Sequence, residues 1–353
     1  MARTNVEYRG RATALSRIRV TRLGVAATAV MLTAALGGCA QAPGSAAAAP
    51  KGVTVLDYGV TTKSLSSIPL LVGEAKGFFS DAGLKLNVAV VGQSGKVCQQ
   101  VIAGALNVGE CSTSDAIQAI GSGGKITIPF FMSQSVLPNS VYAKPGITSW
   151  SQLKGKTVMV AGPRDNTMYF TKLMAAAGGL NLKDVTLQYA GSSTDRFAAL
   201  KSGAVDATIL TTPYDFKAKT AGFTQLDDLT KHLPASQYAG NGVVVGRSWA
   251  ANNKPVLKKL YSAMEKSLAY ALDPKNKADV ISVLQQQAKV DAPTAQWGYT
   301  KLLSSGYFFT GGKPDNGGLN GIVSSLKSLG FLSHGTVPSN TDICDETLVL
   351  GSS

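Results

Sequence analysis

Short apolar runs and longer amphipathic stretches alternate along the first half of the chain. The runs at 53–60, 84–91 and 106–110 predict buried strands, because they are short and are bounded by Gly or polar turns. The segments that follow these runs predict helices, and Pro69 stands at a helix start, where its missing N–H leaves no hydrogen bond unmade. The succession returns further along, with predicted strands at 156–161, 184–190 and 204–210 and predicted helices at 167–177 and 196–202. Such alternation is typical of the α/β class with mostly parallel sheets.

Two segments 99 residues apart share one pattern. Residues 103–115 read AGALNVGECSTSD, and residues 202–214 read SGAVDATILTTPY. The correspondence extends on both sides, and the matching pairs are Gly92 with Gly191, Ser94 with Ser193, Gly104 with Gly203, Ala105 with Ala204, and Thr113 with Thr212. We expect two equivalent lobes, although unrelated strand–helix–strand units also look alike. A strand at 241–246 and three or four helices from 254 to 330 follow the second lobe.

The N-terminal segment has the features of an export signal. Residues 1–22 carry six Arg and one Glu, and a short apolar run from Leu23 to Leu36 is followed by Gly37, Gly38 and Cys39. This Leu-Gly-Gly-Cys ending resembles a bacterial lipobox, which implies a lipoprotein signal at 1–38, lipidation of Cys39 and a lipidated tether at 39–51. A plain signal cut near 47–49 is the alternative.

Charge and hydropathy narrow the class of partner. Removal of residues 1–38 lowers the formal net charge from +13 to +8, and the remaining basic residues are mostly scattered Lys. They form no cluster with interleaved aromatic residues, so nucleic acid is not an expected partner. No apolar segment after Cys39 is long enough to cross a membrane, which requires roughly 20 residues.

Hydroxyl-rich turns follow the predicted strands in both lobes. They lie at 92–95, 112–115, 162–167, 191–195 and 211–215. In parallel sheets ligands bind beyond the carboxyl ends of strands, where the next helix presents free N–H groups that suit an anion. Ser, Thr, Asp and Asn are also ordinary helix N-caps, so a purely structural role remains open for each of them.

Charged residues near these turns suggest more specific roles. The chain after Cys39 holds only three Arg, and two of them, Arg164 and Arg196, fall in or beside the turns, where either could clamp a carboxylate, sulfonate or phosphate. Glu110 ends a predicted strand near the same edge and could meet an amine on a zwitterionic or cationic ligand. Pairing with a surface Lys is its alternative role.

Two cysteines are placed to meet. Cys98 lies early in a predicted helix and Cys111 ends the strand that returns to the same edge, so the two could form a disulfide. Two free buried thiols are the alternative.

Three segments together identify a family resemblance. Residues 68–88 (IPLLVGEAKGFFSDAGLKLNV), 148–160 (TSWSQLKGKTVMV) and 196–210 (RFAALKSGAVDATIL) resemble the nitrate/taurine/alkanesulfonate/thiamine-pyrimidine family of ABC-transporter substrate-binding proteins. The resemblance covers roughly 52–310. It implies the type 2 periplasmic-binding-protein fold, which has two α/β lobes, mostly parallel sheets with helices on both faces, and a ligand cleft between the lobes.

The resemblance also implies a domain division and a set of site residues. Lobe I would comprise 52–143 and 240–353, lobe II would comprise 144–239, and hinges would lie near 140–147 and 236–244. By analogy with the family's cleft loops, and with the two Arg added, the expected ligand-binding residues are Thr61, Ser66, Gln93, Ser94, Ser112, Thr113, Arg164, Asn166, Thr167, Ser193, Thr194, Arg196, Thr211, Thr212 and Tyr214.

The function that this resemblance implies is capture of a small organic anion, a sulfonate or carboxylate, for an ABC importer. Its partners would be the permease and ATPase subunits, and the protein would be an exported, lipid-anchored monomer without cofactor or metal. A tethered ligand sensor is the alternative. An enzyme related to thiamine-pyrimidine synthesis is disfavoured, because His232 and His334 lie outside the predicted cleft turns and the sequence has no Cys cluster and no GxSxG motif.

Overall fold

The computed structural model describes residues 52–350 except 234–237, 305, 314 and 333–335. These residues belong to one compact unit of the chain. The predicted lipidation site Cys39, the signal at 1–38 and the tether at 39–51 lie outside the described residues. None of the described helices is long and apolar enough to span a membrane.

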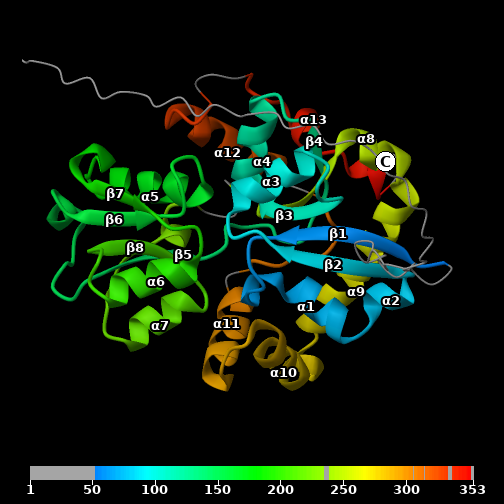
Figure 1. The fold of residues 1–353 in the computed structure, drawn as a ribbon, viewed down its shortest axis with the longest axis horizontal. Coiled ribbons are helices and arrows are strands. Elements are labelled where there is room, and N and C mark those ends of the chain that lie inside the picture. The colour runs from blue at the N-terminus through cyan, green and yellow to red at the C-terminus, as the bar shows by residue number, and fades with distance from the viewer. Residues whose placement is uncertain (1–51, 234–237, 305, 314, 333–335, 351–353) are drawn as a thin grey trace, which may run out of the picture. The chain divides into compact units, whose positions relative to one another are not determined.

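The described residues form two five-stranded mixed sheets, each covered by helices (Figure 1). The first sheet has the order β2-β1-β3-β10-β4 and the second has the order β7-β6-β8-β5-β9. The first contains β1 (Thr54–Val60), β2 (Leu84–Val90), β3 (Val108–Ser112), β4 (Ile126–Phe131) and β10 (Asn241–Gly246). The second contains β5 (Asn139–Ala143), β6 (Thr157–Val160), β7 (Thr186–Tyr189), β8 (Ala207–Thr211) and β9 (Thr224–Asp228).

One strand in each sheet runs against the others. β10 is antiparallel to both β3 and β4, and β5 is antiparallel to both β8 and β9, whereas the remaining pairs are parallel. These two strands are also the ones displaced from chain order, since β5 follows β4 of the first sheet and β10 follows β9 of the second. The predicted mostly parallel α/β architecture is therefore confirmed. β5 pairs in the second sheet, although its residues fall within the range predicted for lobe I, which ends at residue 143.

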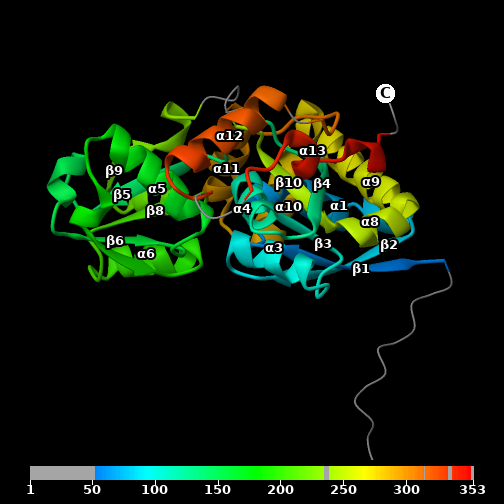
Figure 2. The ribbon, with the colours of Figure 1, turned by 90° about the horizontal axis from the view of Figure 1, so that it is seen from above.

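Helices follow the strands as the amphipathic pattern predicts. The helices that follow strands of the first sheet are α1 (Ile68–Ala75), α2 (Phe78–Asp81), α3 (Ser94–Ile102) and α4 (Thr113–Gly121). Those that follow strands of the second sheet are α5 (Asn166–Ala177), α6 (Ser193–Lys201) and α7 (Tyr214–Thr220). The C-terminal part adds α8 (Arg247–Asn252), α9 (Lys254–Leu272), α10 (Lys277–Ala288), α11 (Ala292–Ser304), α12 (Asn316–Ser328) and α13 (Asn340–Ile343) (Figure 2).

The first sheet buries a different apolar cluster on each face. Leu56, Tyr58 and Val60 of β1 join one cluster with α1 and α9, whereas Val97 and Val101 of α3 join another. Successive strand residues point to opposite faces, so a strand with this alternation separates two helical layers. Gly109 of β3 permits the close approach of α3, because a Cβ there would lie 2.5 Å from Cγ1 of Val97.

The sequence repeat at spacing 99 corresponds to a repeat of structure. β2, α3, β3 and α4 occupy the same positions relative to the first sheet as β7, α6, β8 and α7 do in the second. Gly104 and Gly203 follow α3 and α6 with φ of 74° and 78°, a left-handed conformation that favours glycine. The repeated pattern therefore encodes the same strand–helix–strand turn in both sheets.

Candidate ligand-binding site

A pocket opens at the edge of the two sheets where the parallel strands end. It has a volume of about 240 Å³. Residues that follow β1, β2 and β3 line it from the first sheet, and residues that follow β6, β7 and β8 line it from the second. The antiparallel strands contribute their first residues, Asn139 of β5 and Asn241 of β10. The antiparallel direction brings the start of these strands to the same edge as the carboxyl ends of the others.

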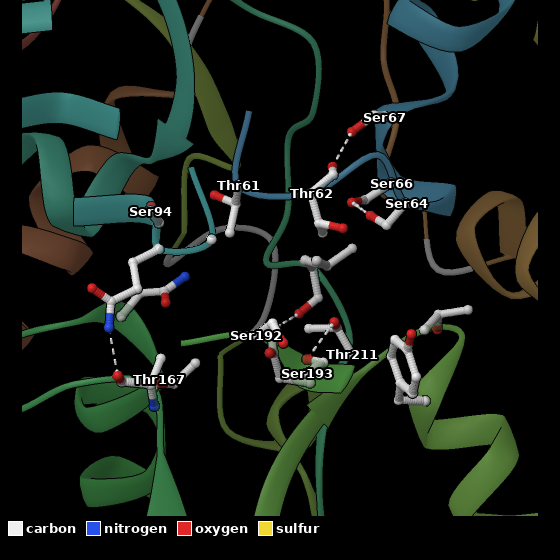
Figure 3. Close-up of a pocket in the computed structure, with 18 of the residues that line it drawn as sticks. Thr61, Thr62, Ser64, Ser66, Ser67, Ser94, Thr167, Ser192, Ser193 and Thr211 are labelled. Atoms are coloured by element: carbon white, nitrogen blue, oxygen red, sulfur yellow. Dashed lines mark hydrogen bonds between the residues drawn. The ribbon is translucent and has the colours of Figure 1, made fainter. Parts of the chain in front are cut away.

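Hydroxyl side chains dominate the walls of the pocket. Figure 3 shows one group from the first sheet facing a second group from the second sheet. The first group comprises Thr61, Thr62, Ser64, Ser66, Ser67 and Ser94, and the second comprises Thr167, Ser192, Ser193 and Thr211. Ser64 and Ser66 lie 2.8 Å apart between hydroxyl oxygens, and Ser193 and Thr211 lie 3.2 Å apart. Hydroxyls both donate and accept, so such walls can bind a polar ligand in several orientations.

Four helices begin at this pocket. α3, α5, α6 and α7 start at Ser94, Asn166, Ser193 and Tyr214, and all four residues line it. The first N–H groups of a helix have no partner within the helix, and the helix dipole is positive at this end. The side chain of Ser192 caps α6 by accepting from the N–H of Asp195, which leaves other N–H groups of the first turn for a ligand. The arrangement favours a negatively charged group beside α6.

The guanidinium of Arg196 supports the wall formed by the second sheet. Its Nε donates to the carbonyl of Ile209 at 2.9 Å, and its Nη1 donates to the carbonyls of Ala190 and Gly191 at 3.0 and 2.7 Å. Its Nη2 donates to Oγ of Ser193 at 2.8 Å. Arg196 is 3% exposed, and burial lowers its pKa to about 10. Arg196 thus holds the turn in place and directs positive charge toward the pocket through Ser193.

Glu110 is the acid of the first-sheet wall. It lies in β3, lines the pocket and accepts a hydrogen bond from the Tyr58 hydroxyl at 2.6 Å. Burial raises the pKa of Glu110 to about 7, although the Tyr58 hydrogen bond acts in the opposite direction. The same burial raises the pKa of Tyr58 well above its ordinary value. A carboxyl group of this kind changes charge near neutral pH.

Polar contacts join the two walls beside the pocket. Nε2 of Gln93, after β2, donates to the carbonyl of Ala161, after β6, at 2.6 Å. On another side, Nζ of Lys301 in α11 lies 2.7 Å from Oδ2 of Asp215 in α7, and the rings of Trp297 and Phe216 stack with centroids 5.2 Å apart. These contacts connect elements of the two sheets around the pocket.

The family of this chain can now be stated. A family model described as NMT1/THI5 like matches residues 64–278, which is more than half of the chain. The chain belongs to the NMT1/THI5-like family. No curated protein matches the sequence. The matched region of this family member starts in the hydroxyl-rich loop after β1 and ends in α10.

Solved structures show the fold of this NMT1/THI5-like protein. The ligand-binding component of an ABC-type import system from Staphylococcus aureus aligns with a TM-score of 0.69 at 12% identity, covering 85% of this chain and 99% of that one. The alkanesulfonate-binding protein SsuA from Xanthomonas axonopodis pv. citri, solved with MOPS bound, gives 0.64 at 15% identity, covering 84% and 97%. The desulfurization enzyme DSZB gives 0.58 at 16% identity, covering 83% and 97%. The fold is that of type 2 periplasmic binding proteins, and it occurs in binding proteins and in an enzyme.

The pocket brings together all of the predicted ligand-binding residues except two. Those that line it are Thr61, Ser66, Gln93, Ser94, Ser112, Asn166, Thr167, Ser193, Thr194, Arg196, Thr211, Thr212 and Tyr214. Their role in binding a ligand is a proposal. They come together because the strands and helices of each sheet return the chain to one edge.

Thr113 and Arg164 lie elsewhere in this NMT1/THI5-like protein. Thr113 is buried, and its hydroxyl donates to the carbonyl of Gly240. Arg164 lines a separate surface depression, where its Nη2 donates to the carbonyl of Phe331 at 3.3 Å. The turn after β6 directs Asp165 toward the pocket and Arg164 toward the C-terminal part of the chain. Neither residue therefore lines the proposed site.

Several lining residues were absent from the sequence-based prediction. They include Thr62, Lys63, Ser64, Ser67, Asp165, Phe170, Ser192 and Lys217, with Ala288, Lys289 and Val290 from the end of α10 and the loop after it. Ser64 and Ser67 stand in the same loop as the predicted Thr61 and Ser66, and Ser192 stands in the hydroxyl-rich turn at 191–195, so these segments gave a signal for them. Residues 288–290 follow a helix far along the chain, and no pattern in the sequence relates them to the pocket.

Cys98 and Cys111 form a disulfide in the structure, with their Cα atoms 6.3 Å apart. Cys98 lies in α3, and Cys111 lies next to the last residue of β3 and lines the pocket. The bond fixes the first turns of α3 against the neighbouring strand. Cys344 is a free, partly buried cysteine.

Proposed function

We propose that this chain is the extracytoplasmic solute-binding component of an ABC importer and that it captures a small organic anion by closure of two lobes. The anion would be a sulfonate or a carboxylate. The observation that carries this proposal is the pocket itself, where hydroxyl groups and the α6 N-terminus from one sheet face hydroxyl groups from the other. Its volume of about 240 Å³ suits a small solute.

The proposal includes the cellular setting. The lipid on Cys39 would anchor an exported monomer to the cell membrane, facing the periplasm or the exterior. The permease and ATPase of the importer would receive the solute. The chain would divide into lobe I (52–143 and 240–353) and lobe II (144–239), with β5 pairing across that boundary in the second sheet. The import system and the alkanesulfonate-binding protein among the structural relatives support this setting.

The side chains in the pocket favour binding over catalysis. Cys111 lines it but is held in the disulfide, and no His is among the lining residues. His232 instead bonds Asp227, with Nε2 2.9 Å from the nearer carboxylate oxygen, and His334 lies outside the described residues. A Ser or Thr nucleophile would therefore lack a His base within the lining set. A tethered ligand sensor shares all of these features and differs only in what reads the closed form.

A thermal-shift screen of the purified full-length protein tests solute binding. The panel contains propane-1-sulfonate, 3-aminopropanesulfonate, benzoate, benzenesulfonate and nitrate. A ligand that binds only the folded state raises the melting temperature with the logarithm of its concentration. We expect at least one organic anion to act in this way and the double variant Ser193→Ala/Thr211→Ala to lose the shift. Ser202→Ala, at the exposed end of the same helix, is the control and should keep it.

Two outcomes would contradict the proposal. One is the absence of a shift across the panel, and the other is a shift that the double variant retains. Import is tested separately by deleting the gene and measuring uptake of the radiolabelled solute. Unchanged uptake with intact binding would favour the sensor.

A further inference from the structure

Glu110 places a carboxyl group in the pocket without a basic partner. Among the ion pairs of the described residues, none involves Glu110. Among the described residues, the one side chain that donates a hydrogen bond to Glu110 is the neutral Tyr58 hydroxyl. A carboxylate removed from water is costly unless a cation or several hydrogen bonds stabilise it. Glu110 therefore lacks the partner that its charged form requires.

The groups around Glu110 do not supply this partner. Tyr58 faces it from β1, and Tyr307 lies in the segment after α11, where burial and, to a smaller extent, the charge of Glu110 raise its pKa. Asn241 of β10 is occupied by the Tyr307 hydroxyl, to which its Nδ2 donates at 3.1 Å. Lys63 lines the pocket, but its Nζ pairs with Glu74 of α1 at 3.2 Å. The first-sheet wall thus presents a carboxyl group and neutral donors to the ligand.

The opposite wall has the opposite electrostatic character. Arg196 donates to Oγ of Ser193, which leaves the Ser193 proton to point away from the guanidinium, toward Thr211 or a ligand. The α6 N-terminus lies at the same place. Asp165 and Asp195 act on Arg196 through their charge, but no carboxylate oxygen of the described residues pairs with it within 4.0 Å. A negative ligand group is therefore favoured beside Ser193 and disfavoured beside Glu110.

We propose that the ligand is a zwitterion, with an acidic group at the Ser193 wall and a protonated amine against Glu110. This inference rests on the proposed solute-binding function and makes it narrower. Glu110 is then the residue that selects an amino-bearing acid over the corresponding acid without an amine. Tyr58 is a positioning residue, because its hydrogen bond fixes the carboxyl group toward the pocket.

Matched probes separate the contribution of the amine. The purified full-length protein is titrated with 3-aminopropanesulfonate, propane-1-sulfonate and N-acetyl-3-aminopropanesulfonate, which share one acid and differ at the amine position. Hydrogen bonds between charged groups in a buried site favour the amine by about tenfold or more in Kd. We expect this preference for 3-aminopropanesulfonate over both other probes.

Two variants and a control assign the preference to Glu110. Glu110→Gln keeps the shape and should abolish the preference, with weaker binding of 3-aminopropanesulfonate and unchanged or tighter binding of propane-1-sulfonate. Tyr58→Phe keeps the carboxylate and should reduce the preference without abolishing it. Glu265→Gln changes a half-buried acid outside the pocket whose pKa burial also raises, and should have no effect.

The pH dependence gives a readout that a structural role would not produce. The amine of 3-aminopropanesulfonate stays protonated from pH 6 to pH 8, whereas Glu110 loses its proton near pH 7. Binding of the zwitterion should therefore strengthen as pH rises through about 7, and binding of propane-1-sulfonate should not. Because Asp165 also lines the pocket and titrates, the comparison is made with Glu110→Gln, in which the rise should disappear.

The possible results distinguish this inference from the function on which it rests. Binding of propane-1-sulfonate as tight as that of 3-aminopropanesulfonate contradicts the zwitterion and leaves solute binding intact. A preference that persists in Glu110→Gln contradicts the role of Glu110. Failure of all three probes and of the wider anion panel contradicts both proposals.

Discussion

Asp115 and Asp165 are buried carboxyl groups that come from different sheets and share one environment. Asp115 lies in the first turn of α4 and Asp165 caps α5, and they are 3% and 7% exposed. Gly95 is close to both carboxyl groups. Its N–H donates a hydrogen bond that stabilises the charged form of Asp165. A Cβ at Gly95 would lie 4.0 Å from the carboxyl carbon of Asp115. Burial and the charge of Asp165 raise the pKa of Asp115 well above its ordinary value.

Replacing Asp115 by Asn should stabilise the protein at alkaline pH. A carboxyl group whose pKa is raised on folding destabilises the folded state at a pH above that pKa, and the effect disappears as pH falls through the raised pKa toward the unfolded value. Since Oδ2 of Asp115 has no partner among the described residues, we expect a gain of about 1–3 kcal/mol at pH 8 and little change at pH 4. Thermal unfolding between pH 4 and pH 8 measures it. The exposed Asp184→Asn is the control, and a variant less stable than wild type at pH 8 would contradict the account.

Replacing Arg196 by Lys should destabilise the turn after β7. The guanidinium donates hydrogen bonds to three carbonyls and to the Ser193 hydroxyl, and one ammonium group cannot reach all four acceptors. Unsatisfied buried acceptors predict a loss of about 2–4 kcal/mol in the free energy of unfolding, measured by urea denaturation. Arg247→Lys is the matched control, because Arg247 is more exposed and donates to the carbonyl of Asp342. A loss below about 0.5 kcal/mol in Arg196→Lys would show that the network is not required.

Removing the charge of Lys301 should leave Asp215 as a buried anion. The Asp215 side chain is 1% exposed and also accepts from the Thr212 hydroxyl at 3.0 Å. Loss of one partner of a buried pair predicts that Lys301→Met lowers the free energy of unfolding by about 3 kcal/mol. The double variant Lys301→Met/Asp215→Asn should recover much of this loss. Strictly additive effects of the two substitutions would show that the pair is not coupled.

Removing the disulfide should lower stability with little change in the fold. The bond closes a loop between residues 13 apart, for which chain entropy predicts about 3 kcal/mol. Cys98→Ala/Cys111→Ala should therefore melt at a lower temperature than wild type under oxidising conditions and should match reduced wild type. Cys344→Ala removes a free cysteine and serves as the control. Equal melting temperatures for the double variant and oxidised wild type would contradict a stabilising role.

The sequence predicted the strands that carry the repeat but not β4, β5 or β9. β4 contains Pro129, which disfavours a strand in the sequence pattern. The register between β4 and β10 shifts at this point, so that Ile128 and Pro129 together oppose Val244, and this irregularity accommodates the Pro. β9 is polar and lies at the edge of its sheet, and β5 begins with the polar residues Asn139 and Ser140, which interrupt the apolar pattern. Their pairing depends on neighbours that are distant in sequence.

The location of the pocket was predictable, whereas the direction of individual side chains was not. Turns after parallel strands meet at one edge, so Thr61, Gln93, Ser193 and Thr211 could be grouped from sequence alone. Arg164 stands next to Asp165, yet the local turn sends these two side chains to different sites. Such directions depend on backbone torsions and on carbonyl acceptors that no residue pattern reveals.

Native mass spectrometry of the full-length protein tests the central claim most directly. Wild type, Thr61→Trp and Val55→Trp are incubated with the anion and zwitterion panel, since Thr61 lines the pocket and Val55 is exposed at the other end of β1. The account predicts one bound solute per chain in wild type and Val55→Trp, and none in Thr61→Trp, whose ring fills the pocket. A solute that binds folded Thr61→Trp as well as wild type, or no bound solute in any variant, would contradict it.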